Sequence, residues 1–304
     1  MFTTHNNHYK IGYDGINDFR VRENRNQKHT VEFGRAKRVS SFKQEAINAA
    51  KQIYKDANGK TIYISYSGGV DSEFIIHAFL AAEVPFEVIT ARFKDDINAY
   101  DFYYAEKFCS KYSFKFNVLD VDVIKFLETK MMDYAVAMKC CSPQFPLHYY
   151  IWDSVDGFIV AGHELVFRRN NRIPLFETVE KEDNVHRYHI WRNRDGAPAF
   201  YFYTPELVLS FMMDPEIMKL FSYGKAFSMS YSGIQKTRLY EKCFGLEKRK
   251  QATGFELIND IDKKYRKVLE EMFLFPPNHI CNIHLNEMME QLCPKYFLEK
   301  GIMP

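Results

Sequence analysis

The chain has 304 residues, which suits one large domain or one domain with a smaller appended one, and it can bury a substantial core. An aromatic content of 16% excludes a disordered chain, and a formal charge of +2 excludes a sequence-wide attraction to nucleic acid, although local basic patches stay open. No apolar run approaches the ~20 residues of a membrane span, and the polar N-terminus lacks a signal peptide's apolar segment. We therefore expect a cytoplasmic protein with no membrane partner and with its six cysteines reduced.

Residues 1–40 are polar and show no sustained periodicity, which predicts an N-terminal arm outside the core. The arginines and lysines of this arm indicate a solvated surface more than a contact with an acidic partner. A helix is predicted next, because apolar residues recur at helical spacing from Phe42 to Ile53 and Ser40 or Ser41 offers an N-cap. This helix leads to the first predicted strand of the core.

The stretch from Thr61 to Leu80 is the most informative part of the chain. It begins with β-branched and aromatic residues, breaks at two adjacent glycines, and resumes with apolar residues at helical spacing, which predicts a strand, a tight loop and a helix. The glycines allow backbone N–H groups to converge, and the helix start adds partial positive charge, so phosphate oxygens can be held there. We expect Ser72 to cap the helix or touch a phosphate, and Asp71 to orient the loop or a divalent cation. The alternative, an ordinary strand-turn-helix connection, is disfavoured by the specific string over Ser67–Ser72.

The next segments continue an alternation of strands and helices. A strand is predicted over Phe86–Phe93, a helix over Ile97–Tyr112, and a third strand near Phe116–Val121. This rhythm is typical of a doubly wound, mainly parallel α/β sheet. In such a sheet, ligands bind at the carboxyl ends of the strands.

Residues 123–152 are predicted to be mainly helical, with a break at Cys140–Pro143. The adjacent cysteines there lack the gap of a Cys-x-x-Cys site, which favours a buried structural role over catalysis. A further strand is predicted from Gly157, and it ends at a second glycine, Gly162. Residues 41–169 are therefore expected to form the α/β core.

The chain changes character between residues 170 and 205. Short aromatic and charged runs lie on either side of Asp195-Gly196, a hairpin signal, so we predict an antiparallel β-hairpin insertion. Residues 206–304 are mixed in charge and predicted to be a helical C-terminal region, with helices beginning near Thr204 and Pro215 and another over Phe255–Phe273. Four polar side chains of the insertion would either contact an anionic substrate or lie on a solvent-exposed face of the ribbon, and both explain them equally well: His186, Arg187, His189 and Arg192.

The string Ser67-Gly68-Gly69-Val70-Asp71-Ser72 resembles the PP-loop of the ATP pyrophosphatases, also called the adenine nucleotide alpha-hydrolase-like superfamily. This superfamily includes PAPS reductases, ATP-using tRNA thiolation and lysidine enzymes, deazaguanine nitrile synthases, and the synthetase domains that make GMP and asparagine. No Gly-Lys-Ser/Thr ending follows the glycines, so the loop is not a Walker A loop. The resemblance is to the PAPS reductase-like branch over roughly residues 40–250. It implies a HUP-like fold and an enzyme that cleaves ATP to AMP and pyrophosphate with Mg²⁺, activating an acceptor by adenylation.

The resemblance also implies which residues form the site. The adenine and ribose would lie across the ends of the first two strands, and the later glycine strand would complete the phosphate side. The implied nucleotide-binding residues are Ser65, Ser67, Gly68, Gly69, Val70, Asp71, Ser72, Thr90, Ala91, Arg92, Phe93, Gly162 and Arg169. The implied catalytic residues are Asp71, Ser72, His163, Glu164 and Arg168, with Asp71 holding Mg²⁺ through pyrophosphate or water.

Two of these assignments have open alternatives. Arg92 is equally explained by a surface ion pair with Asp95 or Asp96. His163 and Glu164 would otherwise cap their strand, with the neighbouring arginines solvated.

Two further stretches contain residue types used in catalysis or metal binding. PAPS reductases carry a C-terminal Glu-Cys-Gly-Leu/Ile-His motif. The nearest string here, Glu241-Lys-Cys243-Phe-Gly-Leu246, lacks the adjacent glycine and the histidine, so Cys243 is expected to be a core thiol. A sulfonucleotide reductase is the alternative enzyme. Four residues near the C-terminus are of the types that bind zinc, but their spacing is not diagnostic of a zinc site, and a helical cap is favoured over zinc binding. They are His279, Cys281, His284 and Cys293.

The acceptor is unidentified, and it is a small molecule or a nucleic acid. A nucleic acid is motivated by basic residues: Arg168, Arg169, Arg172 and Lys248 to Lys250. A protein that binds an adenine nucleotide without turnover is the alternative outside enzymes, and homo-oligomerisation stays open.

Overall fold

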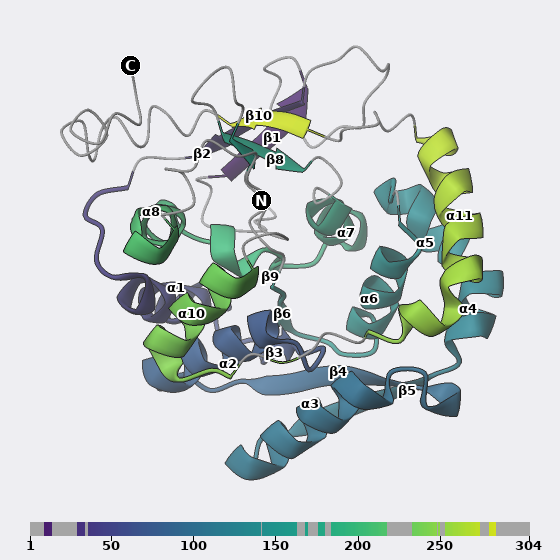
Figure 1. The fold of residues 1–304 in the computed structure, drawn as a ribbon, viewed down its shortest axis with the longest axis horizontal. Coiled ribbons are helices and arrows are strands. Elements are labelled where there is room, and N and C mark those ends of the chain that lie inside the picture. Colours follow the sequence, from purple (N-terminus) through teal and green to yellow (C-terminus); the bar gives the residue numbers. More distant parts are fainter. Residues whose placement is uncertain are drawn as a thin grey trace.

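A parallel β-sheet lies at the centre of the computed structural model, which describes residues 9–13, 29–33, 36–140, 142–162, 168–169, 176–179, 184–217, 233–247, 249, 253–273 and 280–283 (Figure 1). Within this described part of the chain the sheet has five strands in the order β5-β4-β3-β6-β9, and every neighbouring pair is parallel. The strands are β3 (Ile62–Ser65), β4 (Glu87–Phe93), β5 (Phe116–Val121), β6 (Phe158–Val160) and β9 (Gly196–Ala197). The predicted α/β fold with a doubly wound parallel sheet is confirmed.

Helices cover both faces of the sheet because alternate strand residues point to opposite sides. In β6, Phe158 and Val160 join one apolar cluster while Ile159 joins the other. The first cluster includes α1 (Phe42–Asp56), α2 (Val70–Ala82), α8 (Pro205–Met213) and α10 (Gly233–Phe244). The second includes α4 (Val123–Thr129), α5 (Met131–Met138), α6 (Gln144–Trp152), α7 (Asn184–Arg192) and α11 (Asn259–Met272).

The local signals read from the sequence explain where several helices begin. Ser41 caps α1, because its Oγ accepts a hydrogen bond from the Gln44 N–H at 3.3 Å. Thr204 caps α8 in the same way, with a proline in the first turn. The helix α3 (Ala99–Tyr112) connects β4 to β5, and the predicted break near Cys140 separates α5 from α6. None of the helices in the described ranges is both long and apolar enough to cross a bilayer.

The predicted hairpin across Asp195-Gly196 is wrong. Residues 184–192 form α7 instead, and the chain then turns into β9, which pairs in parallel with β6. Val185 and Tyr188 are buried at helical spacing, and the next residue, His189, is buried as well. Burial of this face against the sheet therefore decides the structure over the local turn signal. Arg187 and His189 are buried rather than displayed along a ribbon, and the His186 side chain lies outside the described residues.

A second sheet joins segments from both ends of the chain. Its order is β1-β2-β10-β8-β7, and it contains an antiparallel pair, β7 (Arg168–Arg169) with β8 (Phe176–Val179). The other members are β1 (Tyr9–Tyr13), β2 (His29–Phe33) and β10 (Ile280–Ile283). Part of the predicted N-terminal arm is thus in strands, whereas the helix expected beyond Pro215 extends outside the described residues.

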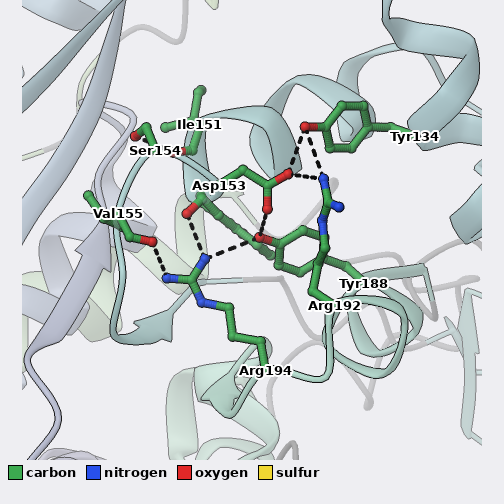
Figure 2. Close-up of polar contacts among 9 residues, drawn as sticks. Tyr134, Ile151, Asp153, Ser154, Val155, Tyr188, Arg192 and Arg194 are labelled. Carbon is green, nitrogen blue, oxygen red and sulfur yellow. Dashed lines mark hydrogen bonds and ion pairs between the residues drawn. The ribbon is translucent and has the colours of Figure 1, made fainter.

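A polar network holds the turn between α6 and β6 (Figure 2). The Asp153 carboxylate accepts hydrogen bonds at 2.7 Å from the hydroxyls of Tyr134 and Tyr188, and it forms an ion pair with Arg192. The Arg194 guanidinium donates to main-chain carbonyls at the helix end and in the turn, those of Trp152 (2.8 Å), Gly157 (3.1 Å) and Val155. The last carbonyls of a helix lack intrahelical hydrogen-bond partners, and the Arg194 guanidinium supplies donors at the end of α6. It thereby anchors β6 and β9.

Replacing Arg194 should therefore destabilise the fold. We expect Arg194→Met to lower the free energy of unfolding by roughly 2 to 4 kcal/mol, because hydrogen bonds from a charged donor are lost and part-buried carbonyls remain unpaired. Urea denaturation followed by circular dichroism measures this. Arg92→Met is the control, since its ion pair with Asp120 is exposed and should contribute little. Equal effects of the two substitutions would contradict the anchoring role.

Candidate functional site

The loop between β3 and α2 depends on a glycine at position 68. Gly68 has φ +87°, a conformation that side chains disfavour, and a Cβ built there would lie 2.1 Å from the main-chain oxygen of Asp101 in α3. The backbone of the loop therefore packs directly against the backbone of α3. Any larger residue would push the loop away from the sheet edge.

Hydrogen bonds between residues close in the sequence fix the rest of the loop. The Gly69 N–H donates to Ser67 Oγ at 3.3 Å, and the Ser72 hydroxyl donates to the Gly69 carbonyl at 3.1 Å. Gly69 is the N-cap of α2 in an extended conformation, so Ser72 lies in the first turn rather than at the cap. The first N–H groups of any helix lack intrahelical partners and carry partial positive charge. The loop therefore presents a helix start suited to an anion.

A cavity of about 100 Å³ opens beside this loop, at the carboxyl ends of β3 and β4. Its walls come from these strands, from the start of α3, from α6 and from the segment after residue 252. The lining residues are Ser65, Tyr66, Ser67, Ile89, Thr90, Ala91, Phe93, Asn98, Asp101, Gln144, Leu147, His148, Ile151, Thr253 and Phe255. Five residues predicted for nucleotide binding are thus brought together: Ser65, Ser67, Thr90, Ala91 and Phe93.

Buried polar contacts hold the strand ends that form the cavity. The Asn98 side chain accepts a hydrogen bond from the Phe93 N–H at 2.8 Å and donates to the Ala91 carbonyl at 3.0 Å. The Trp152 indole donates to Ser65 Oγ at 3.0 Å. Asn98 lies within seven residues of both of its partners, whereas the contact between Trp152 and Ser65 joins residues 87 positions apart, and no local motif indicates it.

Arg92 does not line this cavity. Its side chain is 53% exposed, and its Nε lies 2.6 Å from Asp120, the residue directly opposite on β5. The ion pair that was the alternative for Arg92 thus exists, but with Asp120 rather than with Asp95 or Asp96. The strand register places the two charges side by side.

The carboxylate of Asp71 is bound by the C-terminal part of the chain. Lys236 Nζ lies 2.8 Å from Oδ1 and 2.9 Å from Oδ2, and the Tyr240 hydroxyl donates to Oδ1 at 2.9 Å. The Tyr240 ring stacks on Phe74 of α2 at 4.4 Å between centroids, and the Tyr201 hydroxyl donates to the Asp71 carbonyl. No sequence pattern indicates that Lys236, Tyr240 and Tyr201 meet Asp71. Lys236 and Tyr240 share one face of α10 at i, i+4 spacing, but that spacing does not reveal their partner.

Glu73, two residues further along the first turn of α2, is paired in a similar way. It accepts a hydrogen bond from the Tyr66 hydroxyl at 2.9 Å and forms an ion pair with Arg249. Burial raises the pKa of Tyr66 to about 12, so this hydroxyl stays protonated as a donor at neutral pH. Arg249 also lies over the Tyr104 ring, 5.0 Å from its centroid.

The remaining predicted site residues are only partly described. His163 and Glu164 lie outside the described residues, and for Arg168 and Arg169 only the backbone of β7 is described. At Gly162, two residues after the end of β6, a Cβ would meet the Ile75 side chain at 2.8 Å, so the glycine lets the chain pass close to α2. His279, His284 and Cys293 also fall outside the described ranges, and among the residues inside them no group of three or more His, Cys, Asp or Glu is placed to hold a metal ion.

Comparisons with known proteins do not identify a family. No protein-family model matches the chain, and no curated protein does. An NH3-dependent NAD synthetase from Campylobacter jejuni, solved with a nitrate ion, is 12% identical over 87% of this chain and 98% of its own, with a TM-score of 0.33. The U34-tRNA thiolase NcsA from Methanococcus maripaludis, solved with its 4Fe-4S cluster, is 14% identical over 75% and 79%, with a TM-score of 0.31. These similarities are too low to transfer an activity.

The close packing of Gly68 can be tested with a matched glycine. Gly59 also has a positive φ, +82°, but a Cβ there would meet nothing within 4 Å. We expect Gly59→Ala to cost roughly 1 to 2 kcal/mol of stability for the backbone conformation alone, and Gly68→Ala to cost more because of the clash with Asp101. Thermal or urea denaturation measures both. Equal losses would show that the contact with α3 does not constrain the loop.

Proposed function

We propose that this chain is an enzyme that binds ATP with Mg²⁺ at the loop and its neighbouring cavity, cleaves ATP to AMP and pyrophosphate, and so activates an acceptor by adenylation. One observation carries this proposal: the Ser-Gly-Gly-Val-Asp-Ser loop opens at the carboxyl edge of the parallel sheet, beside a cavity at the ends of β3 and β4. Ligands of doubly wound sheets bind at this edge. The motif and the geometry thus support the same ligand.

The arrangement suits the two ends of a nucleotide. The loop amides and the start of α2 would hold the phosphates, because both carry positive partial charge. Apolar side chains of the cavity, such as Ile89 and Leu147, would contact the flat base, while Thr90 and His148 offer polar groups. Ser67 belongs to both the loop and the cavity wall, so the two subsites are continuous.

The chemistry requires stabilisation of charge. Attack in line at the alpha phosphate spreads negative charge over the departing pyrophosphate, and preorganised N–H groups stabilise that charge without rearranging. Ser72 would orient the loop through its bond to Gly69, which keeps the helix start open to the phosphates. A second nucleophile would then displace AMP from the adenylated acceptor.

Magnesium fits this site through the phosphates rather than through a protein carboxylate. Mg²⁺ keeps several waters and takes oxygen ligands, often from substrate phosphates, and it neutralises charge on them. The Asp71 carboxylate is bound by Lys236 and Tyr240, so it suits an indirect contact through pyrophosphate or water. No protein residue needs to leave its partner for the metal to bind in this way.

The proposed activity is tested by incubating the protein with ATP and Mg²⁺, alone and with candidate small-molecule and RNA acceptors. We expect AMP and pyrophosphate in equal amounts, with release stimulated by the true acceptor, because pyrophosphate leaves when the adenylate forms. Anion-exchange chromatography measures both products. Gly68→Ala is expected to lower turnover at least tenfold. Binding of ATP without either product would favour a sensor, and release of ADP would contradict the proposed cleavage site.

The environment of Cys243 does not favour a sulfonucleotide reductase, which would need this thiol as its nucleophile. Cys243 is 6% exposed on α10, and burial raises its pKa to about 11, so the nucleophilic thiolate is scarce at neutral pH. The nearby Asp214 charge adds to this shift. Such a thiol behaves as a core side chain.

We therefore expect Cys243→Ser to retain the release of AMP and pyrophosphate, and the wild-type protein to form no sulfite from PAPS with a thiol donor. In the native protein, Cys243 should resist alkylation at pH 8 and react only after unfolding, which mass spectrometry of the labelled peptide measures. Sulfite formation that depends on Cys243 would replace the proposed activity with a reductase.

A further inference from the structure

Each acidic side chain in the first turn of α2 is matched by a cation from the C-terminal region. Asp71 is paired with Lys236 and Glu73 with Arg249. The Asp71 and Lys236 side chains are 13% and 6% exposed, so solvent screens their interaction weakly. The pairs therefore cancel two negative charges directly beside the loop.

This cancellation has a consequence for anion binding. An unpaired carboxylate one residue beyond Val70 would repel a phosphate at the helix start and oppose the partial charge of the amides. With Lys236 against both carboxylate oxygens, the negative charge of Asp71 is balanced by an adjacent cation, so it opposes the partial positive charge of the amide groups less. Tyr240 fixes the carboxylate further, since its ring is held by stacking on Phe74.

We propose that Lys236 is a positioning residue for nucleotide binding, which acts by neutralising and holding Asp71 rather than by touching the phosphates, and that Asp71 is therefore an anchor and not a direct metal ligand. This inference rests on the proposed function. It names α10 as part of the phosphate site, although α10 lies more than 150 residues after the loop in the sequence. The same pair ties α10 to α2 and so couples the C-terminal region to the loop.

The test is a double-mutant cycle on the full chain, with Mg²⁺-ATP binding measured by calorimetry. We expect Lys236→Met to weaken binding about tenfold or more, because the negative charge of Asp71 is then no longer balanced by Lys236 beside the phosphates. Asp71→Asn together with Lys236→Met should bind within about threefold of the wild-type protein, since neither charge remains. Lys242→Met is the matched control, because Lys242 lies on the same helix and pairs with Asp214, and it should bind like the wild type.

Measuring thermal unfolding as well as affinity distinguishes a positioning role of the Asp71–Lys236 pair from a purely structural pair. It would change the melting temperature of Lys236→Met but leave the affinity of the folded protein unchanged, and that result overturns the inference. If Lys236→Met fails to fold, the double variant still tests the inference. It should fold, because replacing both partners leaves no unpaired buried charge. Recovery of affinity in the double variant supports the inference.

Further results would also overturn the inference. A double variant as weak as Lys236→Met would mean that Lys236 contacts the phosphates directly. An Asp71→Asn variant that loses binding only in the presence of Mg²⁺ would make Asp71 a metal ligand. Absence of ATP binding by the wild-type protein would overturn the proposed function together with this inference, whereas normal binding by Lys236→Met overturns the inference alone.

Discussion

The contact between Gly68 and the main-chain oxygen of Asp101 is the constraint on which the site depends. It fixes the loop after β3 against the start of α3, where a Cβ would come within 2.1 Å of that oxygen. Because α3 follows β4, the same contact brings the loop next to the end of the neighbouring strand. Ser67 of the loop and Asp101 of α3 both line the cavity between the two strand ends. Because Gly68 has no Cβ, the loop can approach α3 closely, and this approach influences the shape of the proposed nucleotide site.

Charge around the loop is controlled by distant parts of the chain. The first turn of α2 carries two carboxylates, which by themselves would make a poor anion site, and the C-terminal region supplies a cation to each. The aromatic stack of Tyr240 on Phe74 joins the same helices through their apolar faces. Packing and electrostatics therefore act on the same pair of helices, so the C-terminal region packs directly beside the loop.

The opposite end of the sheet is held by different means. There the Arg194 guanidinium and the Asp153 carboxylate satisfy the backbone and side-chain groups that remain at the end of α6 (Figure 2). These contacts anchor β6 and β9 next to β3, and the strand that carries the loop is thereby supported on both sides. The carboxyl edge of the sheet stays available for a ligand, while the amino edge is occupied by structural polar contacts.

The sequence by itself determined the α/β core, because its signals are local. Apolar periodicity predicted α1, α2, β4 and β5, and the loop string indicated the turn between β3 and α2. Tertiary structure decided the rest. Val185 and Tyr188 are in a helix, not a hairpin, since burying one face against the sheet outweighs a turn signal at Asp195-Gly196.

The site shows the same division. Ser65, Ser67 and Thr90 were predictable because strand ends meet at one edge of a parallel sheet, and all three line the cavity. Arg92 is turned away from it, since the strand register pairs it with Asp120. Lys236, Tyr240 and Arg249 carry no motif, and their closeness to α2 arises only when the C-terminal segment packs on the core. Local spacing specifies elements, whereas the partners of charged side chains depend on long-range packing that spacing does not encode.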